Sequence, residues 1–566
     1  MPRLAKIKSD KLTRMQPDLP EGYYLDNVIT LFDHVESLYA DILDQAHLDF
    51  LHDFAALTTD AKKLYIRLLN RTHHLFRLSK LNYPEIASMQ KAIETLETSN
   101  FIETSPRIEP EELITLFSKT ELLAHHSNHA DLEKLKRSEL NTHFLEQPND
   151  AFFAQLSASD CLLQVQQKEC YTLCQMLFFG NLNQSMTDFV LRDLGLYQYE
   201  NYRIDTESRP YTDRLDIQQH WLLYRLESLL QITGPNDIET LRTCFDAVPA
   251  DTDPDSPLFR KGERIKYEIA RQIERLDELP LALQLYRQCT LPPNRERITR
   301  ILHRQGEIED AIEHCQNIIE EPSSEEELQF ASAFGRRLVR QYKIQHRPAF
   351  ASPDSNHKPE LFDLELIRQD SVEQAVVDYY LAQDKDNQCY YIENSLFNGV
   401  LGLLIWDAVF APVAGAFYNP FQHRPADFYA QNFQSKRAEL FTRIWSRITN
   451  TENIWRQASI CWQEKFGRMN PLVNWQALNL ETLELALQRI PFRHWMKIFD
   501  RILLDLRNNR AGFPDLVLFP AAGGYQLVEV KGPGDSLQKN QQRWMQYFFE
   551  QDIPHNIARV SWAEEA

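Results

Sequence analysis

The stretch GFPDLVLFPAAGGYQLVEVKGPGD, residues 512–535, holds two short apolar runs that each carry ionisable side chains at one end. Asp515 precedes the first run, and Glu529 and Lys531 close the second. The residues PAAGG between the runs include two glycines, which supply the positive φ angles that a tight turn needs. The stretch is therefore predicted to form a β-hairpin.

The predicted register of this hairpin brings its ionisable side chains together. Val517 pairs with Leu527, so Asp515 lies opposite Glu529, with Cβ atoms roughly 4.5 to 5.5 Å apart. Lys531 projects to the same face as Glu529, because side chains two apart in a strand point the same way. A loop shorter by one residue would move Asp515 to the other face. The hairpin thus predicts one cluster of two carboxylates and a lysine.

The chemistry of this cluster points to a divalent metal ion. Two unpaired carboxylates at that distance repel each other, and burial strengthens the repulsion. Mg²⁺ or Mn²⁺ relieves it by taking oxygen ligands, and substrate phosphate oxygens complete the coordination. The lysine is suited to orient a water molecule or to neutralise charge on a phosphate. The alternative is a structural hairpin with a surface ion pair worth about 0 to 1 kcal/mol.

Gln541 is a further candidate for the cluster. The turn GPGDS after Lys531 predicts a helix capped by Asp535 or Ser536. Gln541 then lies on the apolar face of this helix. The other members of that face are Leu537, Trp544 or Met545, and Phe548. Gln541 is therefore predicted either to reach the cluster or to form an ordinary hydrogen bond in the core.

Glu393 is a candidate upstream acid. It opens the segment ENSLFNGVLGLLIWDAVF and is predicted to share a helical face with Phe397 and Leu404. An acid on an apolar face indicates a metal ligand or an acid that supports one. The alternative is a first-turn glutamate favoured by the helix dipole.

Basic side chains at two places are candidates for contacts with phosphates. The segment AKKLYIRLLNRTHHLFRLSK, residues 61–80, contains no acid, and three of its cations lie four residues apart on one helical stripe: Lys63, Arg67 and Arg71. Near the hairpin the candidates are Arg507, Arg510, Lys539 and Arg543. The alternative for each group is an ordinary solvated face.

The composition of the chain bounds its class. A chain of 566 residues exceeds one hydrophobic core, so two to four domains are expected, and the 16 glycines favour a mostly α protein. A formal charge of -20 argues against a protein that coats nucleic acid nonspecifically. The eight cysteines include no CxxC pair and indicate reduced thiols in a cytosol-like compartment. No export signal or membrane-spanning run is recognised, so cytoplasmic localisation and no membrane partner are expected.

The sequence predicts four segments. Residues 1–150 form a helical region with a small nucleic-acid-binding module, and residues 151–345 form a solenoid-like helical middle. In that middle, two helix–turn–helix stretches align at an offset of 29, which sets Ala282 against Ala311; an ordinary helical bundle is the alternative. Residues 346–364 carry three prolines and form a linker, and residues 365–566 form an α/β domain that contains the hairpin.

Several of these stretches together resemble a known family. The Pro-Asp and Glu-Val-Lys spelling of the hairpin is the PD-(D/E)xK nuclease signature. With LVEVKGPGDSLQKNQQRW and GLLIWDAVF…NPFQ, it resembles the VRR-NUC domain of the Fanconi-associated nucleases. The resemblance is strong over residues 365 to 560. It extends more loosely to DAKKLYIRLLNR, to MTDFVLRDLGLYQYENY, and to a domain order with a SAP-like module, a tetratricopeptide-like middle and a terminal nuclease.

The resemblance implies a structure-specific DNA phosphodiesterase that uses Mg²⁺ or Mn²⁺. Such an enzyme cuts near 5′ flaps, degrades DNA from 5′ to 3′, and acts in the repair of interstrand crosslinks. The implied metal ligands are Asp515, Glu529, the Val530 carbonyl and Glu393. Lys531 would be the catalytic lysine, and Gln541 would support the site.

The same resemblance bears on partners and alternatives. The chain looks like the shorter bacterial form, because no Cys/His ubiquitin-binding finger is present. It is expected to bind branched or flapped DNA as a monomer or a DNA-dependent dimer. A Holliday-junction resolvase and a non-catalytic DNA-repair scaffold are the alternatives.

Overall fold

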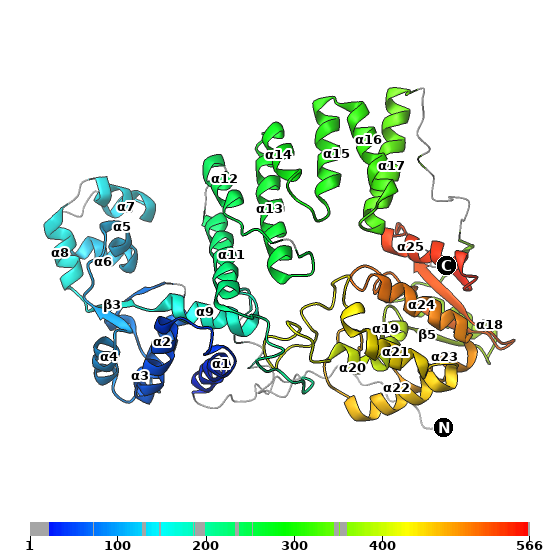
Figure 1. Cartoon of the computed structure of the whole chain (residues 1–566), viewed down its shortest axis with the longest axis horizontal. Coiled ribbons are helices and arrows are strands. Elements are labelled where there is room, and N and C mark those ends of the chain that lie inside the picture. Colours follow the sequence, from blue (N-terminus) through cyan, green and yellow to red (C-terminus); the bar gives the residue numbers. More distant parts are fainter. Residues whose placement is uncertain are drawn as a thin grey trace. The chain divides into compact units, whose positions relative to one another are not determined.

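The computed structural model describes residues 22–71, 73–126, 132–146, 149–184, 186, 189, 198–232, 237–251, 253–344, 350 and 359–563. It divides the chain into two compact units, Met1–Leu196 and Tyr197–Ala566 (Figure 1). The fold is mostly helical with a strand-containing domain at the end, as the sequence predicts. Among the described residues, no helix is both long enough and apolar enough to cross a membrane.

The first unit contains helices around a small antiparallel sheet whose strand order is β1-β3-β2. Its elements before residue 105 are α1 (Tyr23–Tyr39), α2 (Gln45–Ala56), α3 (Thr59–Leu69), β1 (Leu75–Arg77), α4 (Met89–Thr98) and β2 (Ile102–Thr104). Those after it are α5 (Pro110–Leu113), α6 (Lys119–Ala124), α7 (Arg137–Glu146), α8 (Asp150–Ala158), β3 (Leu162–Val165) and α9 (Lys168–Phe179). Because β3 pairs with both β1 and β2, the predicted segment boundary at residue 150 would separate β3 from the two strands with which it pairs.

The middle of the chain consists of consecutive antiparallel helices. They are α11 (Arg214–Ile232), α12 (Ile238–Asp246), α13 (Pro257–Arg275), α14 (Leu279–Tyr286), α15 (Asn294–Gln305), α16 (Ile308–Glu320) and α17 (Glu325–Tyr342). The turns between these helices repeat at the predicted offset of 29 residues. Asp277 and Gly306 both have positive φ, and each carbonyl accepts a hydrogen bond from the N–H two residues on. Ala282 and Ala311 are both fully buried. The repeat therefore comprises two equivalent helical hairpins.

The terminal domain is built on a five-stranded mixed sheet with the order β4-β8-β7-β6-β5. The strands are β4 (Leu361–Leu366), β5 (Gln388–Tyr391), β6 (Leu516–Phe519), β7 (Gln526–Lys531) and β8 (His555–Trp562). The first of these begins inside the predicted linker 346–364. Of that linker, residues 346–349 and 351–358 lie outside the described residues. The four-segment division of the chain stays a prediction.

Two hydrophobic clusters cover the two faces of this sheet. On one face, Val376 and Val377 of α18 (Val372–Gln383) pack against Leu516, Val528 and Val530. On the other, Val517 and Leu527 belong to a larger cluster made by the remaining helices. These helices are α19 (Leu396–Leu404), α20 (Trp406–Val409), α21 (Ala438–Ser446), α22 (Thr451–Lys465), α23 (Leu480–Arg489), α24 (Phe492–Leu504) and α25 (Lys539–Glu550). Alternate side chains of β6 and β7 are thus buried on opposite faces of the sheet.

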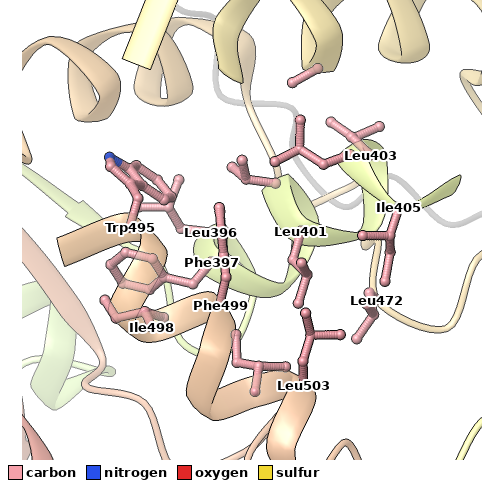
Figure 2. Close-up of a cluster of buried hydrophobic side chains, with 14 of the residues drawn as sticks. Leu396, Phe397, Leu401, Leu403, Ile405, Leu472, Trp495, Ile498, Phe499 and Leu503 are labelled. Atoms are coloured by element: carbon pink, nitrogen blue, oxygen red, sulfur yellow. The ribbon is translucent and has the colours of Figure 1, made fainter. Parts of the chain in front are cut away.

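Helix α19 lies at the centre of the larger cluster. Every one of its residues is buried, and Figure 2 shows its Phe397 beside Trp495, Ile498 and Phe499 of α24. Gly399 allows the close approach of Leu478 to this helix, because a Cβ at residue 399 would lie 2.7 Å from the Leu478 side chain. This helix therefore provides a rigid support for the segments that lead into the hairpin.

Candidate active site

The predicted hairpin and its register are confirmed. Val517 pairs with Leu527 and Leu516 with Val528, and this register places Asp515 opposite Glu529. The backbone N–H of Val530 donates to Asp515 Oδ2 at 2.8 Å, which ties the carboxylate to the neighbouring strand. Strand alternation directs the two carboxylates and Lys531 to the side of the sheet that carries α25.

Glu529, Lys531 and Gln541 form a closed hydrogen-bonded triangle. Lys531 Nζ lies 2.9 Å from Glu529 Oε1 and donates to Gln541 Oε1 at 3.0 Å. Gln541 Nε2 donates to Glu529 Oε1 at 2.6 Å. The glutamine therefore reaches the cluster, which was one of the two outcomes predicted for it. Its Oε1 also accepts from the N–H of Gln538, so the start of α25 fixes its rotamer.

The start of α25 differs from the prediction. The helix begins at Lys539 with Gln538 as its N-cap, whereas Asp535 or Ser536 was expected to cap it. Residues 532–538 instead continue the loop after β7, so Leu537 lies before the helix. The predicted apolar face is otherwise present, since Trp544 and Phe548 are buried.

Burial and mutual repulsion disfavour the charged forms of both carboxylates. Burial, and then the negative charge of Asp515, raises the pKa of Glu529 to about 8, although Lys531 opposes this shift. Burial likewise raises the pKa of Asp515 to about 6, and the negative charges of Glu373 and Glu393 add to it. Glu529 is fully buried and its Oε2 has no hydrogen-bond partner among the described residues. The two carboxylates therefore need more positive charge than Lys531 alone provides.

Glu393 reaches the site from a turn and not from a helix. Helix α19 begins at Leu396, so the expectation that Glu393 opens it is wrong. The N–H groups of Ile392 and Glu393 both donate to the Asp515 carbonyl, at 2.8 and 3.2 Å. This places the Glu393 backbone directly against Asp515 at the end of β5.

Glu373 is a site residue that the sequence reasoning missed. It lies in the first turn of α18, accepts a hydrogen bond from Ser371 Oγ at 2.6 Å, and is near enough to raise the pKa of Asp515. Its position as an acid in a first helical turn is too common to single it out in the sequence.

Asp515 is positioned by the aromatic residue two places before it. The Phe513 ring lies 5.4 Å from that of Phe397 and 4.1 Å from that of Trp544, so it joins α19 to α25. Gly512 has φ +93°, and a Cβ there would lie 2.9 Å from the Asn540 backbone. Only glycine allows the chain to pass so close to the start of α25.

The donor set fits a hard divalent cation. It consists of oxygen ligands, namely two carboxylates at a fixed separation and the unpartnered Oε2 of Glu529. In the described part of the chain, no three His, Cys, Asp or Glu side chains converge as a complete ligand set. Coordination by water and substrate oxygens is consistent with this, because Mg²⁺ commonly keeps several such ligands.

A group of arginines lies near the strand that carries Asp515. Arg424, Arg507 and Arg510 surround the Tyr429 ring, with guanidinium carbons 4.6, 5.4 and 5.2 Å from its centroid. None of the three has a carboxylate within ion-pair distance among the described residues. Burial and the charges of Arg424 and Arg510 lower the pKa of neighbouring His423 to about 4. We call these three residues the Tyr429 arginine cluster; Arg424 was not predicted from the sequence.

The other predicted cations near the hairpin differ in accessibility. Lys539 is exposed at the start of α25. The side chain of Arg543 is only 7% exposed, and its Nη1 lies 3.4 Å from Glu326 on α17. Arg543 therefore stabilises the packing of α25 on the helical middle and is not retained as a DNA contact.

In the first unit, only Lys63 and Arg67 of the predicted stripe lie on α3, because the helix ends at Leu69 and Arg71 lies beyond it. Local contacts occupy both of these side chains. Lys63 Nζ donates to the Glu85 carbonyl at 3.1 Å, and Arg67 pairs with the Glu85 carboxylate at 2.7 Å. Arg67 also lies 4.0 Å from the Tyr24 ring centroid, whereas Arg71 is exposed. The DNA contact predicted for this stripe stays a prediction, and Arg71 is its most accessible member.

Comparisons with known proteins relate this chain to a family. The family model for the VRR-NUC domain matches residues 450–562, and the model described as "FAN1, HTH domain" matches residues 22–103. The Fanconi-associated nuclease 1 homolog of Pseudomonas aeruginosa is 33% identical over 96% of this chain and 97% of its own. The homolog of Arabidopsis thaliana is 23% identical over 90% of this chain and 64% of its own.

Solved structures of a related nuclease are also similar to this chain. The crystal structure of paFAN1 bound to 2-nucleotide 5′ flap DNA with a gap has a TM-score of 0.82 and 31% identity, covering 97% of this chain and 100% of that one. A second structure, with a 1-nucleotide flap, has a TM-score of 0.81. Membership of this family implies dependence on a divalent metal ion. The chain belongs to the Fanconi-associated nuclease family and is a DNA nuclease.

Proposed function

We propose that this nuclease is structure-specific and cleaves branched DNA at 5′ flaps, at the cluster of Asp515, Glu529, Lys531 and Gln541. The observation that carries the proposal is the carboxylate pair of half-buried Asp515 and buried Glu529, whose Oε2 has no partner among the described residues, beside a lysine held at hydrogen-bond distance. The flap substrate is supported by the flap DNA in the related solved structures.

In the proposed mechanism, Asp515, Glu529, the Val530 carbonyl and Glu393 would hold Mg²⁺ or Mn²⁺. When bound there, such an ion would supply a lowered pKa for water and positive charge for the scissile phosphate. Asp515 stays in place through its bond from the Val530 N–H, and Glu529 through Gln541. Lys531 is held by Gln541 where its ammonium can orient the attacking water or stabilise the charged phosphate oxygens.

The grip on DNA is proposed to come from local cationic groups, since the chain as a whole carries a charge of -20. The Tyr429 arginine cluster pairs with no acid in the described part of the chain and suits the phosphates that flank the scissile bond. Lys539 and the stripe of Lys63, Arg67 and Arg71 are proposed to contact phosphates farther along the duplexes. An acidic surface elsewhere then limits binding to plain duplex.

The family also supports finer proposals about biological role. We propose 5′ to 3′ exonuclease activity, a role in interstrand crosslink repair, and a place in a bacterial cytoplasm. The similarity to the Pseudomonas aeruginosa homolog supports them. Whether the protein acts as a monomer or as a DNA-dependent dimer is tested by the stoichiometry of the DNA complex.

The test is cleavage of an end-labelled 5′ flap by the wild type and by Asp515→Ala, each with Mn²⁺, Mg²⁺ or EDTA, together with binding to the same DNA. Metal-dependent cleavage on the flap, lost in the variant while binding is retained, is the expected result. Equal affinity for flap, duplex and single strand would contradict structure specificity. Paired symmetric nicks in a four-way junction, without flap cleavage, would favour a resolvase.

A further inference from the structure

Tyr391 contacts one acid of the site, Glu393, but has no part in the mechanism described above. It is the last residue of β5 and pairs with Leu516, the residue that follows Asp515, so its side chain projects to the α18 side of the sheet at the end where Asp515 lies. Its hydroxyl donates a hydrogen bond to Glu393 Oε2. The residue is nevertheless 54% exposed, so much of its ring is open to solvent at the site.

The hydroxyl of Tyr391 completes the fixation of Glu393. The backbone of Glu393 is already held by the Asp515 carbonyl, and Asn394 Nδ2 donates to Glu393 Oε1 at 3.2 Å. The bond from Tyr391 engages the second carboxylate oxygen. Because Glu393 is exposed, these side-chain bonds are what restrict its rotamers.

The exposed ring suits an uncharged partner. The Glu393 carboxylate accepts the hydrogen bond of the Tyr391 hydroxyl, and the negative charges of Asp515 and Glu373 also act on this hydroxyl. A bare phosphate would be repelled by these acids, whereas the π-face of a nucleobase would not. Stacking of a base on an aromatic side chain contributes about 1 to 3 kcal/mol and depends little on sequence.

Tyr390 shows that this exposure is specific to one position. It pairs with Val517 and points to the α25 side of the sheet, where its ring lies 6.3 Å from that of Phe519, and its hydroxyl donates to Gln388 at 2.9 Å. It is a matched control, because it is the same residue type on the same strand without a contact to the acids.

We propose that Tyr391 is a positioning residue for the cleavage reaction, in which its hydroxyl orients Glu393 and its ring stacks on a base adjacent to the scissile phosphate. The proposal rests on the proposed function, since it requires DNA at this site. It assigns separate effects to the two parts of one side chain, so Tyr391→Phe and Tyr391→Ala distinguish them.

The experiment uses the full chain and a 5′ flap DNA that carries 2-aminopurine next to the cleaved bond. Single-turnover cleavage is measured for the wild type, Tyr391→Phe, Tyr391→Ala and Tyr390→Phe. Affinity and 2-aminopurine fluorescence are measured with the same substitutions in an Asp515→Asn background, where the DNA stays intact. Thermal unfolding of each variant checks folding.

Tyr391→Phe is expected to slow cleavage roughly tenfold, the effect of losing a hydrogen bond to a charged group, with affinity and fluorescence unchanged. Tyr391→Ala is expected to show the same slowing, to bind the DNA about tenfold more weakly, and to lose the quenching of 2-aminopurine. Tyr390→Phe should match the wild type in every measurement.

Cleavage by Tyr391→Phe at the wild-type rate would overturn the role of the hydroxyl, and retained quenching in Tyr391→Ala would overturn the role of the ring. If Tyr391→Ala does not fold, Tyr391→Leu replaces it in the stacking test. A wild type that cleaves the flap while every Tyr391 variant does so equally would refute this inference alone. A wild type that does not cleave the flap would refute the proposed function itself.

Discussion

Replacement of Asp515 by asparagine should stabilise the metal-free protein while it abolishes cleavage. Asparagine keeps the acceptor for the Val530 N–H but removes a charge that burial and nearby acids disfavour. Because the folded-state pKa is raised from 3.8 to about 6, the charged form costs stability above that pH, and the cost is absent below the unfolded pKa.

The magnitude follows from the same shift. A rise from 3.8 to about 6 corresponds to roughly 3 kcal/mol. Asp515 is partly exposed, so solvent screening reduces the expected gain to about 1 to 2 kcal/mol at about pH 8. The gain should shrink as the pH falls through about 6. Removal of the Asp515 charge also lowers the pKa of Glu529, which adds to the gain.

The assay is urea unfolding in EDTA, followed by tryptophan fluorescence. All tryptophans except Trp221 follow residue 400, so the signal reports mainly on the terminal domain. Glu464→Gln, which removes an exposed acid on α22, is the matched control and should change neither stability nor cleavage. Loss of stability in Asp515→Asn at about pH 8 would refute the electrostatic reasoning. Retained cleavage would refute the catalytic role of Asp515.

Four further substitutions test other parts of the structure. Lys531→Met should lower flap cleavage at least about a hundredfold without weakening Mn²⁺ binding, as measured by calorimetry and single-turnover kinetics; weakened binding would contradict the assigned role. Phe513→Ala should lower the free energy of unfolding by about 3 to 5 kcal/mol, because it empties the space between two aromatic rings, and an unchanged urea midpoint would contradict this. Gly512→Ala should cost about 1 to 3 kcal/mol, since φ is +93° and Asn540 blocks the added Cβ; wild-type thermal unfolding would contradict it. Arg437→Met should cost about 3 to 5 kcal/mol by leaving a buried carboxylate unpaired, yet the folded fraction should cleave at the wild-type rate per active site.

The hairpin could be predicted from sequence because its constraints are local. The two glycines fix the loop, and the alternation fixes the face of each side chain, so the Val517–Leu527 pairing determines the place of Asp515. The helical repeat could be predicted for the same reason, since Asp277 and Gly306 occupy equivalent left-handed turns.

The remaining parts of the site depend on contacts between distant segments. Glu393 was placed on a helix because its spacing to Phe397 fits one, but the Asp515 carbonyl holds it in a turn. The partners of Arg67 and Arg543 are acids elsewhere in the chain, so charge periodicity alone could not separate structural cations from accessible ones. Glu373 and Arg424 approach the site only through the tertiary fold.

The central claim is that the hairpin of β6 and β7 holds the metal ion of a DNA nuclease. The most direct measurement is the anomalous scattering of Mn²⁺ in crystals of the wild type and of Glu529→Gln. The account predicts a peak beside Asp515, Glu529 and the Val530 carbonyl in the wild type, and its loss in the variant together with flap cleavage. A peak elsewhere, or cleavage that persists in Glu529→Gln, would contradict the account.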